Sequence, residues 1–455
     1  MRKMLTLEHL EEEFSAGTID TVLACMVDMQ GRLMGKRFHA DYFINNAYDE
    51  THSCNYLLAT DLEMATVEGY KSTGWKAGYG DYVMKPDMST LRRVPWLEGT
   101  ALVLCDVLDH HDYQPIAHSP RAILRRQIAR FVDLGIQPMM ATELEFFLFD
   151  QSYAQACQAG YRDMPLASNY NEDYHIFQTT KEEVVIRAMR NGVYGAGIPV
   201  ECSKGEASAG QEEINIKYDK ALTTADHHSI VKNACKEIAW AHGKAVTFMA
   251  KWDNDSAGSS SHVHQSMWSL EGQPLFLDES REHGMSKMMC HYLAGLLAYA
   301  DDVTCFLAPY VNSYKRFCEG TFAPTKAIWS LDNRTAGFRL CGANTKGIRI
   351  ECRIGGADLN PYLALAGQLA AGMAGVEQQL ELEAEFVGNA YGGQNIREVP
   401  NTLREATLKL DQSTMLREAL GSDVIDHYVH AARWEQRQYD KQVTDWEVAR
   451  GFERA

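Results

Sequence analysis

The sequence predicts an α+β protein with a small, sheet-rich N-terminal domain followed by a larger domain of strands and helices. Three observations support this fold class. The chain has 455 residues, a length that suits two or three domains with a sizeable core. Its N-terminal part contains short apolar runs separated by glycine and proline, which predict strands and turns. Farther along, alternating apolar segments are separated by longer stretches with helical patterns.

The N-terminal strands follow from three segments. Residues 21–38, TVLACMVDMQGRLMGKRF, predict a strand, a turn marked by glycine and a second strand. Residues 77–96 have the glycine and proline content of loops. Residues 101–109, ALVLCDVLD, predict an apolar strand that completes a small sheet.

The larger domain is expected to open with a helix over residues 119–135. Ser119 suits the N-cap, Pro120 suits the first helical position, and Gly135 suits the end of the helix. Further helices are predicted over residues 286–303 and 361–380, before a polar helical tail. No repeat or low-complexity segment marks a third domain.

The composition excludes several classes of protein. A formal net charge of −17 repels nucleic acid and anionic membranes, so neither is expected as a partner. Eleven cysteines without a C-x-x-C pair argue against a disulfide framework and a zinc cage, and favour a reduced, cytoplasmic chain. The N-terminus becomes acidic where an export signal would become apolar. The long apolar stretch 287–310 is interrupted by Asp301 and Asp302, so no membrane span is expected.

Four segments carry charged or imidazole side chains at every second position. Because residues two apart on a strand share a face, each segment would present these groups on one face and apolar groups on the other. The polar faces are Glu143 and Glu145; Glu213, Asn215 and Lys217; His262, His264 and Ser266; and Arg349, Glu351 and Arg353, with Glu206 just before a turn at Gly210. One such strand is more often simply half-solvated. Four together favour a site, and its oxygen-rich ligands suit Mg²⁺ or Mn²⁺ better than zinc.

Arginines supply the opposite charge. They cluster in the segment 316–353 as Arg316, Arg334, Arg339, Arg349 and Arg353. A solvated basic face would favour lysine, whereas guanidinium groups bind carboxylate and phosphate bidentately, so the cluster indicates an anion clamp. Divalent metals beside such a clamp point to phosphoryl transfer from a nucleotide. The chain has no G-x-x-x-x-G-K-[ST] loop and no G-x-G-x-x-G turn, so the nucleotide site is of another type.

Six ordered segments resemble the signature segments of glutamine synthetases and their glutamate:amine ligase relatives. They are ELEFFLFD, GEASAGQEEI, GSSSHVHQS, NSYKRF, DNRTAGFR and RIECRIGGADLNPYLALA. The resemblance extends from VDMQGRLMGKRF to the tail VTDWEVARGFERA, which is nearly the whole chain. It implies a β-grasp-like domain over residues 1–105 and a catalytic domain over residues 106–455, built on a curved antiparallel sheet with surrounding helices.

The resemblance also implies roles for individual residues. One divalent metal would be held by Glu145, Glu206 and Glu213, and a second by Glu143, His262 and Glu351. The phosphates of ATP would contact His264, Arg334, Arg339 and Arg349, and the nucleoside would lie near Ser266 and Tyr218. Glutamate would be bound by Arg316, Arg353 and the loop of Gly258. The residues expected to act in catalysis are Arg334, Arg339 and Arg353.

The family's assembly is implied as well. The chain would form stacked rings, expected to be a dodecamer, with each site completed by an N-terminal segment of a neighbouring subunit. Asp61 and Asp81 are both candidates for that contribution, and the sequence does not choose between them.

Two positions depart from the ammonia-using members that the sequence resembles. Phe322 stands where those members have a glutamate that helps to bind ammonium, and Ala257 stands where they have an asparagine. The expected reaction is therefore ATP-dependent ligation of a small organic amine to the γ-carboxylate of glutamate through γ-glutamyl phosphate. Because Glu319 is the one acid near Phe322 in its segment, a monoamine such as an alkylamine, ethanolamine or an aniline is favoured over a polyamine. Ordinary glutamine synthesis and a non-catalytic relative are the alternatives.

Overall fold

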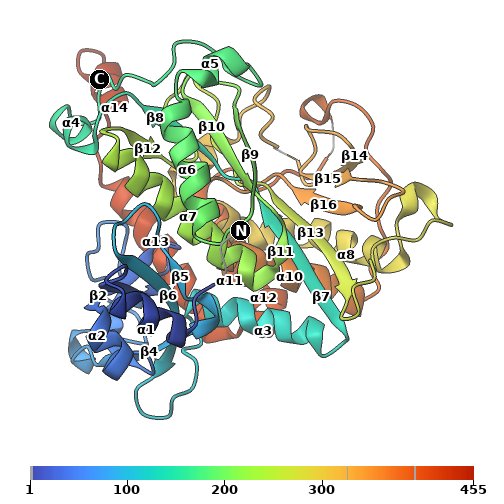
Figure 1. The fold of residues 1–455 in the computed structure, drawn as a ribbon. Helices are drawn as coiled ribbons and strands as arrows, with labels where there is room; N and C mark the ends of the chain where they lie inside the picture. Colours follow the sequence, from blue (N-terminus) through green and yellow to red (C-terminus); the bar gives the residue numbers. More distant parts are fainter. Residues whose placement is uncertain (1–3, 325, 394–395) are drawn as a thin grey trace.

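The computed structural model describes residues 4–324, 326–393 and 396–455, and it contains three sheets (Figure 1). The first has the strand order β2-β1-β6-β4-β3, with β5 paired to β6. Its strands are β1 Thr21–Val27, β2 Leu33–His39, β3 Thr51–Cys54, β4 Asp81–Pro86, β5 Arg92–Arg93 and β6 Thr100–Asp109. The predicted strand–turn–strand over 21–38 and the strand over 101–109 are confirmed. The prediction of loop over 77–96 is wrong in part, because β4 and β5 lie there and both pair with β6. Residue 105, where we predict the domain boundary, lies inside β6, and the division into two domains stays a prediction.

Two further sheets are formed by strands that follow α3 Pro120–Val132 in the sequence. The four-stranded sheet contains β12 Ala245–Thr247, β8 Glu145–Phe149, β10 Gln211–Ile216 and β9 Val200–Gly205, in that order. The six-stranded sheet contains β11 Asp219–Lys220, β7 Ile136–Thr142, β13 Val263–Ser269, β16 Arg349–Cys352, β15 Phe338–Cys341 and β14 Trp329–Leu331, in that order. They meet where β7 is followed by β8, and together they make the curved sheet that the resemblance implies. Its strands pair antiparallel as expected, except that β14 pairs with β15 in parallel.

The join between the two sheets corrects one prediction. The sequence predicts a single strand that carries Glu143 and Glu145, but β7 ends at Thr142 and β8 begins at Glu145. The backbone changes partners here, because the Glu143 N–H donates to the His262 carbonyl (3.1 Å) and the Glu145 N–H donates to the Ser260 carbonyl (3.2 Å). The segment before β13 therefore holds both glutamates at the junction of the sheets.

Helices cover the sheets and form most of the C-terminal part. They are α1 Leu7–Ser15, α2 Ala40–Tyr42, α3 Pro120–Val132, α4 Tyr153–Gln158, α5 Ile176–Thr180, α6 Glu183–Gly195, α7 Ala221–Ala241, α8 Lys287–Ala298, α9 Ala300–Leu307, α10 Pro361–Glu377, α11 Leu403–Gln412, α12 Thr414–Leu420, α13 Ser422–Asp440 and α14 Asp445–Gly451. The predicted N-cap Ser119 and first-turn Pro120 of α3 are confirmed. The predicted helix over 286–303 is instead two helices, interrupted at Tyr299.

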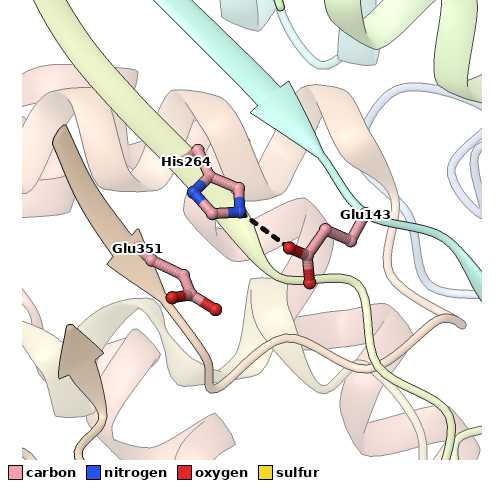
Figure 2. Close-up of side chains that lie close together, drawn as sticks. All are labelled: Glu143, His264 and Glu351. Carbon is pink, nitrogen blue, oxygen red and sulfur yellow. Dashed lines mark hydrogen bonds and ion pairs between the residues drawn. The ribbon is translucent and has the colours of Figure 1, made fainter. Parts of the chain in front are cut away.

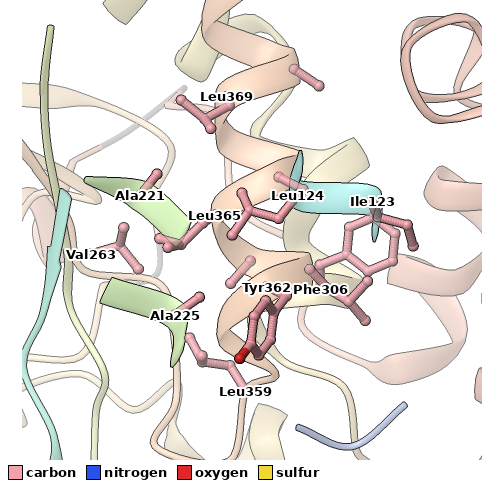
Figure 3. Close-up of a cluster of buried hydrophobic side chains, with 14 of the residues drawn as sticks. Ile123, Leu124, Ala221, Ala225, Val263, Phe306, Leu359, Tyr362, Leu365 and Leu369 are labelled. Carbon is pink, nitrogen blue, oxygen red and sulfur yellow. The ribbon is translucent and has the colours of Figure 1, made fainter. Parts of the chain in front are cut away.

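The central helix α10 is buried on all sides, as its uniformly apolar sequence indicates. Figure 3 shows Tyr362, Leu365 and Leu369 of α10 among apolar side chains of α3, α7 and α9. Val263, which lies between His262 and His264, belongs to the same core. Packing against α10 thus fixes the start of β13. The His264 imidazole projects from this strand, and the His262 imidazole projects from the residue just before it. No helix among the described residues is long and apolar enough to cross a membrane.

Candidate active site

Most of the predicted site residues line one cavity of about 460 Å³ beside the junction of the two sheets. The predicted residues on its wall are Glu143, Glu145, Glu206, Glu213, Gly258, His262, Arg316, Phe322, Arg334, Arg339, Glu351 and Arg353. We call it the acidic cavity. Because these side chains come from segments spread over two hundred residues of sequence, their convergence supports a shared chemical role.

The remaining predicted residues line a neighbouring cavity of about 510 Å³, which we call the aromatic cavity. They are Tyr218, His264, Ser266 and Arg349. Trp268 and Asn215 also contribute, and the Trp268 indole N–H donates to Ser266 Oγ (3.0 Å). Glu143 lines both cavities, so the two adjoin at this carboxylate.

Three carboxylates form the first potential metal centre. One oxygen each of Glu145, Glu206 and Glu213 lies within 4.8 Å of the other two. Glu145 is positioned by the Ser260 backbone N–H (2.7 Å) and by the Ser260 hydroxyl (2.5 Å), which both donate to it. Asn215 donates to Glu213 Oε1 (2.6 Å). This all-oxygen set fits a hard divalent cation.

A second group consists of Glu143, His264 and Glu351, whose ligand atoms also lie within 4.8 Å of one another (Figure 2). His264 Nε2 is 3.0 Å from Glu143 Oε1. His262, the expected ligand, is close as well, because its Nδ1 lies 2.5 Å from Glu143 Oε2 and 3.5 Å from Glu351 Oε1. Of the two imidazoles, His262 lines the acidic cavity and His264 lines the aromatic cavity.

The two groups differ in electrostatics. Burial and the charge of Glu206 raise the pKa of Glu145 to about 8. Burial, followed by the charges of Glu143, Glu145 and Glu206, raises the pKa of Glu213 to about 9. Burial alone would also raise the pKa of Glu351, but the nearby basic groups His262 and Arg353 lower it to about 2. The raised pKa values mean that nearby basic groups do not fully compensate the negative charge of the first group. A bound cation would compensate it.

The arginines are anchored in different ways. Glu351 accepts from Arg353 Nη1 (2.5 Å) and from Arg339 Nη1 (2.9 Å), so both guanidinium groups are held at the acidic cavity. Arg349 Nε donates to His264 Nδ1 (3.2 Å) in the aromatic cavity. Arg334 is exposed on the cavity wall. The four arginines therefore place positive charge in both cavities: three line the acidic cavity and Arg349 lines the aromatic cavity.

Arg316 is the most buried of these cations, at 3% exposed. Its Nη1 and Nη2 donate to the carbonyls of Ile354 and Arg353 (3.0 Å each). Gly258 lies against it, since an added Cβ there would be 2.5 Å from Arg316 Cγ. The glycine is thus required for the close approach of its loop to the arginine.

Phe322 lies at the cavity wall with its ring half exposed (55%). Its backbone has φ = 55°, the left-handed region that a bulky residue seldom adopts. Arg353 Nη2 donates to the Phe322 carbonyl (3.3 Å), and this contact ties the phenylalanine segment to the clamp.

Three further wall residues were not predicted from the sequence. Lys204 pairs with Glu206 (2.5 Å) and Asp173 (3.2 Å), and its Nζ lies 4.3 Å from the centre of the Tyr174 ring. All three line the acidic cavity. Asp173 and Tyr174 lie in an irregular segment without strand alternation, so the period-two pattern could not indicate them. For Lys204 the sequence does contain a signal: it lies two residues before Glu206, a spacing that places both side chains on one face of a strand.

Asp61 and Asp81, the two residues predicted as candidates to complete the site of a neighbouring subunit, lie outside both cavities. Asp61 accepts from Trp434 Nε1 (3.1 Å) and from the backbone N–H groups of Glu63 and Ala65 within its own chain. Asp81 begins β4 and is exposed. Neither lines the acidic or the aromatic cavity.

Comparison with known proteins agrees with this geometry. Residues 117–451 match the family described as "Glutamine synthetase, catalytic domain". The chain is 45% identical over 451 residues to the Streptomyces coelicolor gamma-glutamylethanolamide synthetase GlnA4, covering 99% of this chain and 96% of that one. It is 37% identical to a Pseudomonas glutamate–isopropylamine ligase, covering 95% of each chain.

A solved structure described as a GmaS/ADP complex superposes with a TM-score of 0.86 at 25% identity, covering 99% of this chain and all of that one. A Thermus thermophilus glutamine synthetase is 35% identical, covering 81% of this chain and 84% of that one. The predicted resemblance is therefore confirmed along the length of the molecule. The two potential metal centres, the arginine clamp and these matches together establish that the chain belongs to the glutamine synthetase family, in its glutamate–amine ligase branch.

Proposed function

We propose that this protein joins a small organic amine to the γ-carboxylate of L-glutamate, converting ATP to ADP and phosphate and releasing a γ-glutamylamide. One observation carries the proposal: the acidic cavity combines metal-type carboxylates and arginines with Phe322 on the same wall. Relatives named for ethanolamide and isopropylamide formation support an amine as the second substrate.

The reaction needs two steps, each of which forms one bond and breaks another. A carboxylate oxygen is a poor leaving group, so an amine does not displace it at neutral pH. Transfer of the γ-phosphoryl group from ATP to the γ-carboxylate makes an acyl phosphate and releases ADP. The amine nitrogen then attacks the acyl carbon, the C–O bond to phosphate breaks, and the nitrogen loses a proton. Water must be kept out, because it would hydrolyse the acyl phosphate.

The protein's residues divide these tasks. Glutamine synthetases use ATP and divalent metals, and both acidic groups could hold metal. We assign one Mg²⁺ or Mn²⁺ to Glu145, Glu206 and Glu213, and a second to Glu143, Glu351 and His262, with His264 as the other imidazole within reach. Such ions, when bound, would neutralise phosphate charge and orient the transferred group.

The arginines would stabilise charge that develops during transfer. We assign Arg334 and Arg339 to the phosphates and Arg353 to the reacting carboxyl group, because all three line the acidic cavity. Arg349 and His264 would contact the phosphates from the aromatic cavity, where Ser266 and Tyr218 would lie beside the nucleoside. Arg316 and the Gly258 loop would bind glutamate.

The amine would enter past Phe322 and Tyr174, which line the acidic cavity with aromatic surface. An apolar ring gains about 25 cal/mol per Å² of buried surface from an amine's carbon substituent, whereas ammonia offers no such surface. We therefore favour a monoamine such as an alkylamine, ethanolamine or an aniline.

We also propose that the chain works as a ring-shaped homo-oligomer, expected to be a dodecamer. The support is family membership together with exposed apolar side chains near the C-terminus, at Val443, Trp446 and Phe452. Asp61 and Asp81 remain the candidates for a contribution to a neighbouring site, and the intrachain contacts of Asp61 favour Asp81.

The test is phosphate release from ATP with glutamate and a panel of amines at equal free-base concentration, with the product identified by mass. We expect γ-glutamylamides from at least one small monoamine and weak turnover with ammonia. If glutamine forms as efficiently as any amide, the protein is an ordinary glutamine synthetase. If no amine or ammonia supports ATP turnover, the non-catalytic alternative holds.

A further inference from the structure

Three buried glutamates meet outside both cavities. Glu172 lies before α5, Glu182 is the N-cap residue of α6, and Glu212 lies on β10. One oxygen of each lies within 4.8 Å of the other two. We call this cluster the outer triad, and it lies in the region of Figure 1 where α5 and α6 adjoin β9 and β10.

The outer triad is separated from the catalytic metal centre by a single strand. Glu212 and Glu213 are consecutive on β10, so their side chains project from opposite faces of the sheet. Glu213 lines the acidic cavity, whereas no member of the outer triad lines either cavity. The triad is therefore a distinct group and not an extension of the active site.

Within the described ranges, four of the six carboxylate oxygens of the outer triad have no hydrogen-bond partner outside it. Glu172, Glu182 and Glu212 are 0%, 5% and 1% exposed. Among the described residues, both oxygens of Glu182, Oε2 of Glu172 and Oε1 of Glu212 have no partner beyond the triad itself, in which Glu182 is within hydrogen-bonding reach of Glu172 and Glu212. Glu172 Oε1 does accept one from Ser168 Oγ (2.9 Å).

Among the described residues, cations compensate the charge of the triad only from a distance: Lys181 and Lys244 act on Glu182, and Arg190 acts on Glu212. None of its members forms an ion pair within the part of the chain that the structure describes. The basic side chains around it bind other groups: Lys181 donates to Gln178, Arg190 pairs with Glu183, and Lys244 pairs with Asp150. Burying ionised carboxylates without a counter-charge costs several kcal/mol per ion. A cation or shared protons must offset that cost.

We infer that the outer triad is a further binding site for a hard divalent cation, such as Mn²⁺, Mg²⁺ or Ca²⁺. The ligand atoms are all carboxylate oxygens, which these ions prefer. Oxygen atoms that lie within 4.8 Å of one another can converge on a central ion at the usual distances of about 2.0–2.6 Å.

The site would brace the active-site hairpin. Ser168 Oγ accepts from the Gly210 N–H (2.6 Å) while donating to Glu172, so the triad is linked to the turn between β9 and β10. That hairpin carries Glu206 and Glu213. The Glu172 carbonyl is also packed on β9, since an added Cβ on Gly205 would be 2.5 Å from it. A bound ion would hold the 168–182 segment against the hairpin.

Equilibrium dialysis of the full chain against Mn²⁺ tests the inference, with bound manganese counted per chain. Glu172→Gln/Glu182→Gln should bind one equivalent less than the wild type, and Glu183→Gln, the adjacent acid that pairs with Arg190, should bind the wild-type amount. Glu145→Gln/Glu213→Gln should lose the manganese of the first catalytic group but keep the triad ion. Mn²⁺ should still raise its melting temperature, and adding the triad substitutions should make that rise smaller.

Two results would overturn the inference. One is an unchanged manganese count in Glu172→Gln/Glu182→Gln. The other is a rise in melting temperature on adding Mn²⁺ that is as large in this variant as in the wild type, which is expected if the triad holds shared protons and no ion. If the double variant does not fold, Glu182→Asp, which shortens one ligand, should lower the manganese affinity at least tenfold, and an unchanged affinity also refutes the site. These readouts do not depend on turnover.

Discussion

Glu145 and Glu213 are the residues whose loss should affect chemistry most. Removing either carboxylate leaves the phosphates and the remaining acids without a properly held cation, so Glu145→Ala or Glu213→Ala should lower turnover on the order of a hundredfold or more. The measurement is ATP-dependent amide formation with Mg²⁺ and with Mn²⁺ in excess. Glu279→Ala, an exposed acid away from the cavities, is the control. Near wild-type rates in both active-site variants would refute the metal assignment.

Phe322 should set the choice of nucleophile. Phe322→Glu would place an acceptor and a negative charge at the cavity wall, so the ratio of glutamine to γ-glutamylamide formed should rise at least tenfold, or about 1.4 kcal/mol in relative barrier. Phe322→Leu keeps an apolar surface and should keep the preference for the organic amine. Competition between ammonia and the best amine measures both. An unchanged ratio in Phe322→Glu would reduce the ring to a packing role.

Gly258 tests how closely the glutamate-binding loop must approach Arg316. The Cβ of Gly258→Ala would lie 2.5 Å from Arg316 Cγ and 2.7 Å from the Ala250 carbonyl, so the arginine or the loop must move. We expect the KM for glutamate to rise roughly tenfold, because a 1 Å displacement of a positioning group is costly. Gly392→Ala, where an added Cβ meets nothing within 4 Å, should behave as the wild type. Equal KM values for the two variants would contradict the assignment.

At the level of elements, alternation along strands predicted most of the site. In β16 the residues Ile350 and Cys352 enter the core while Arg349 and Glu351 face the cavities, as expected. The pattern failed where structure is irregular. It could not show that the chain leaves one sheet at Thr142 and joins another at Glu145, because that break is set by the carbonyls of His262 and Ser260. The alternation pattern also could not predict that Tyr174 lies at the acidic cavity, because the position of a loop residue depends on tertiary packing.

The contact that helix α13 makes with His118, just before α3, and with Leu58, after β3, should be sensitive to acid. His118 and His427 stack at 4.2 Å between ring centres, and His427 Nε2 lies 2.8 Å from the Leu58 carbonyl. Burial lowers the pKa of His118 to about 4, and burial also holds the pKa of His427 well below its usual range. Both must stay neutral in the fold, whereas an unfolded histidine takes up a proton below about pH 6.5.

The stability that these two neutral histidines contribute should therefore be complete above about pH 6.5 and fall as the pH drops toward 4, because their unfolded forms then bind more protons than their folded forms. For His118 alone the loss approaches on the order of 3 kcal/mol at pH 4. Denaturant unfolding at pH 8, 7, 6 and 5 measures the slope. His118→Gln should flatten it and His110→Gln, an exposed control, should not. The same dependence of stability on pH in His118→Gln and in the wild type would contradict the assignment.

For the molecule as a whole, the prediction is assembly. Mass measurement in solution should give a multiple of the 51.1 kDa chain far above a dimer, and we expect a dodecamer. The physical reason is the apolar surface left exposed in one chain, including Trp446 at 67% and Phe452 at 86%. Trp446→Glu/Phe452→Glu should shift the mass distribution toward smaller species, and Glu279→Ala should not. A fully active monomer would rule out sites shared between subunits.

The order of Glu212 and Glu213 along β10 has a consequence for insertions and deletions. Because neighbouring residues of a strand project to opposite sides, shifting β10 by one position against β8 would turn Glu213 away from the active site and bring Glu212 into it. Both residues are glutamate, so the cavity would regain a carboxylate while Asn215, which orients Glu213, would be turned outward. A length change in the turn at Ser208–Gly210 would thus keep the composition of the site and lose its geometry. The length of this turn should therefore tolerate less variation than its residue identities.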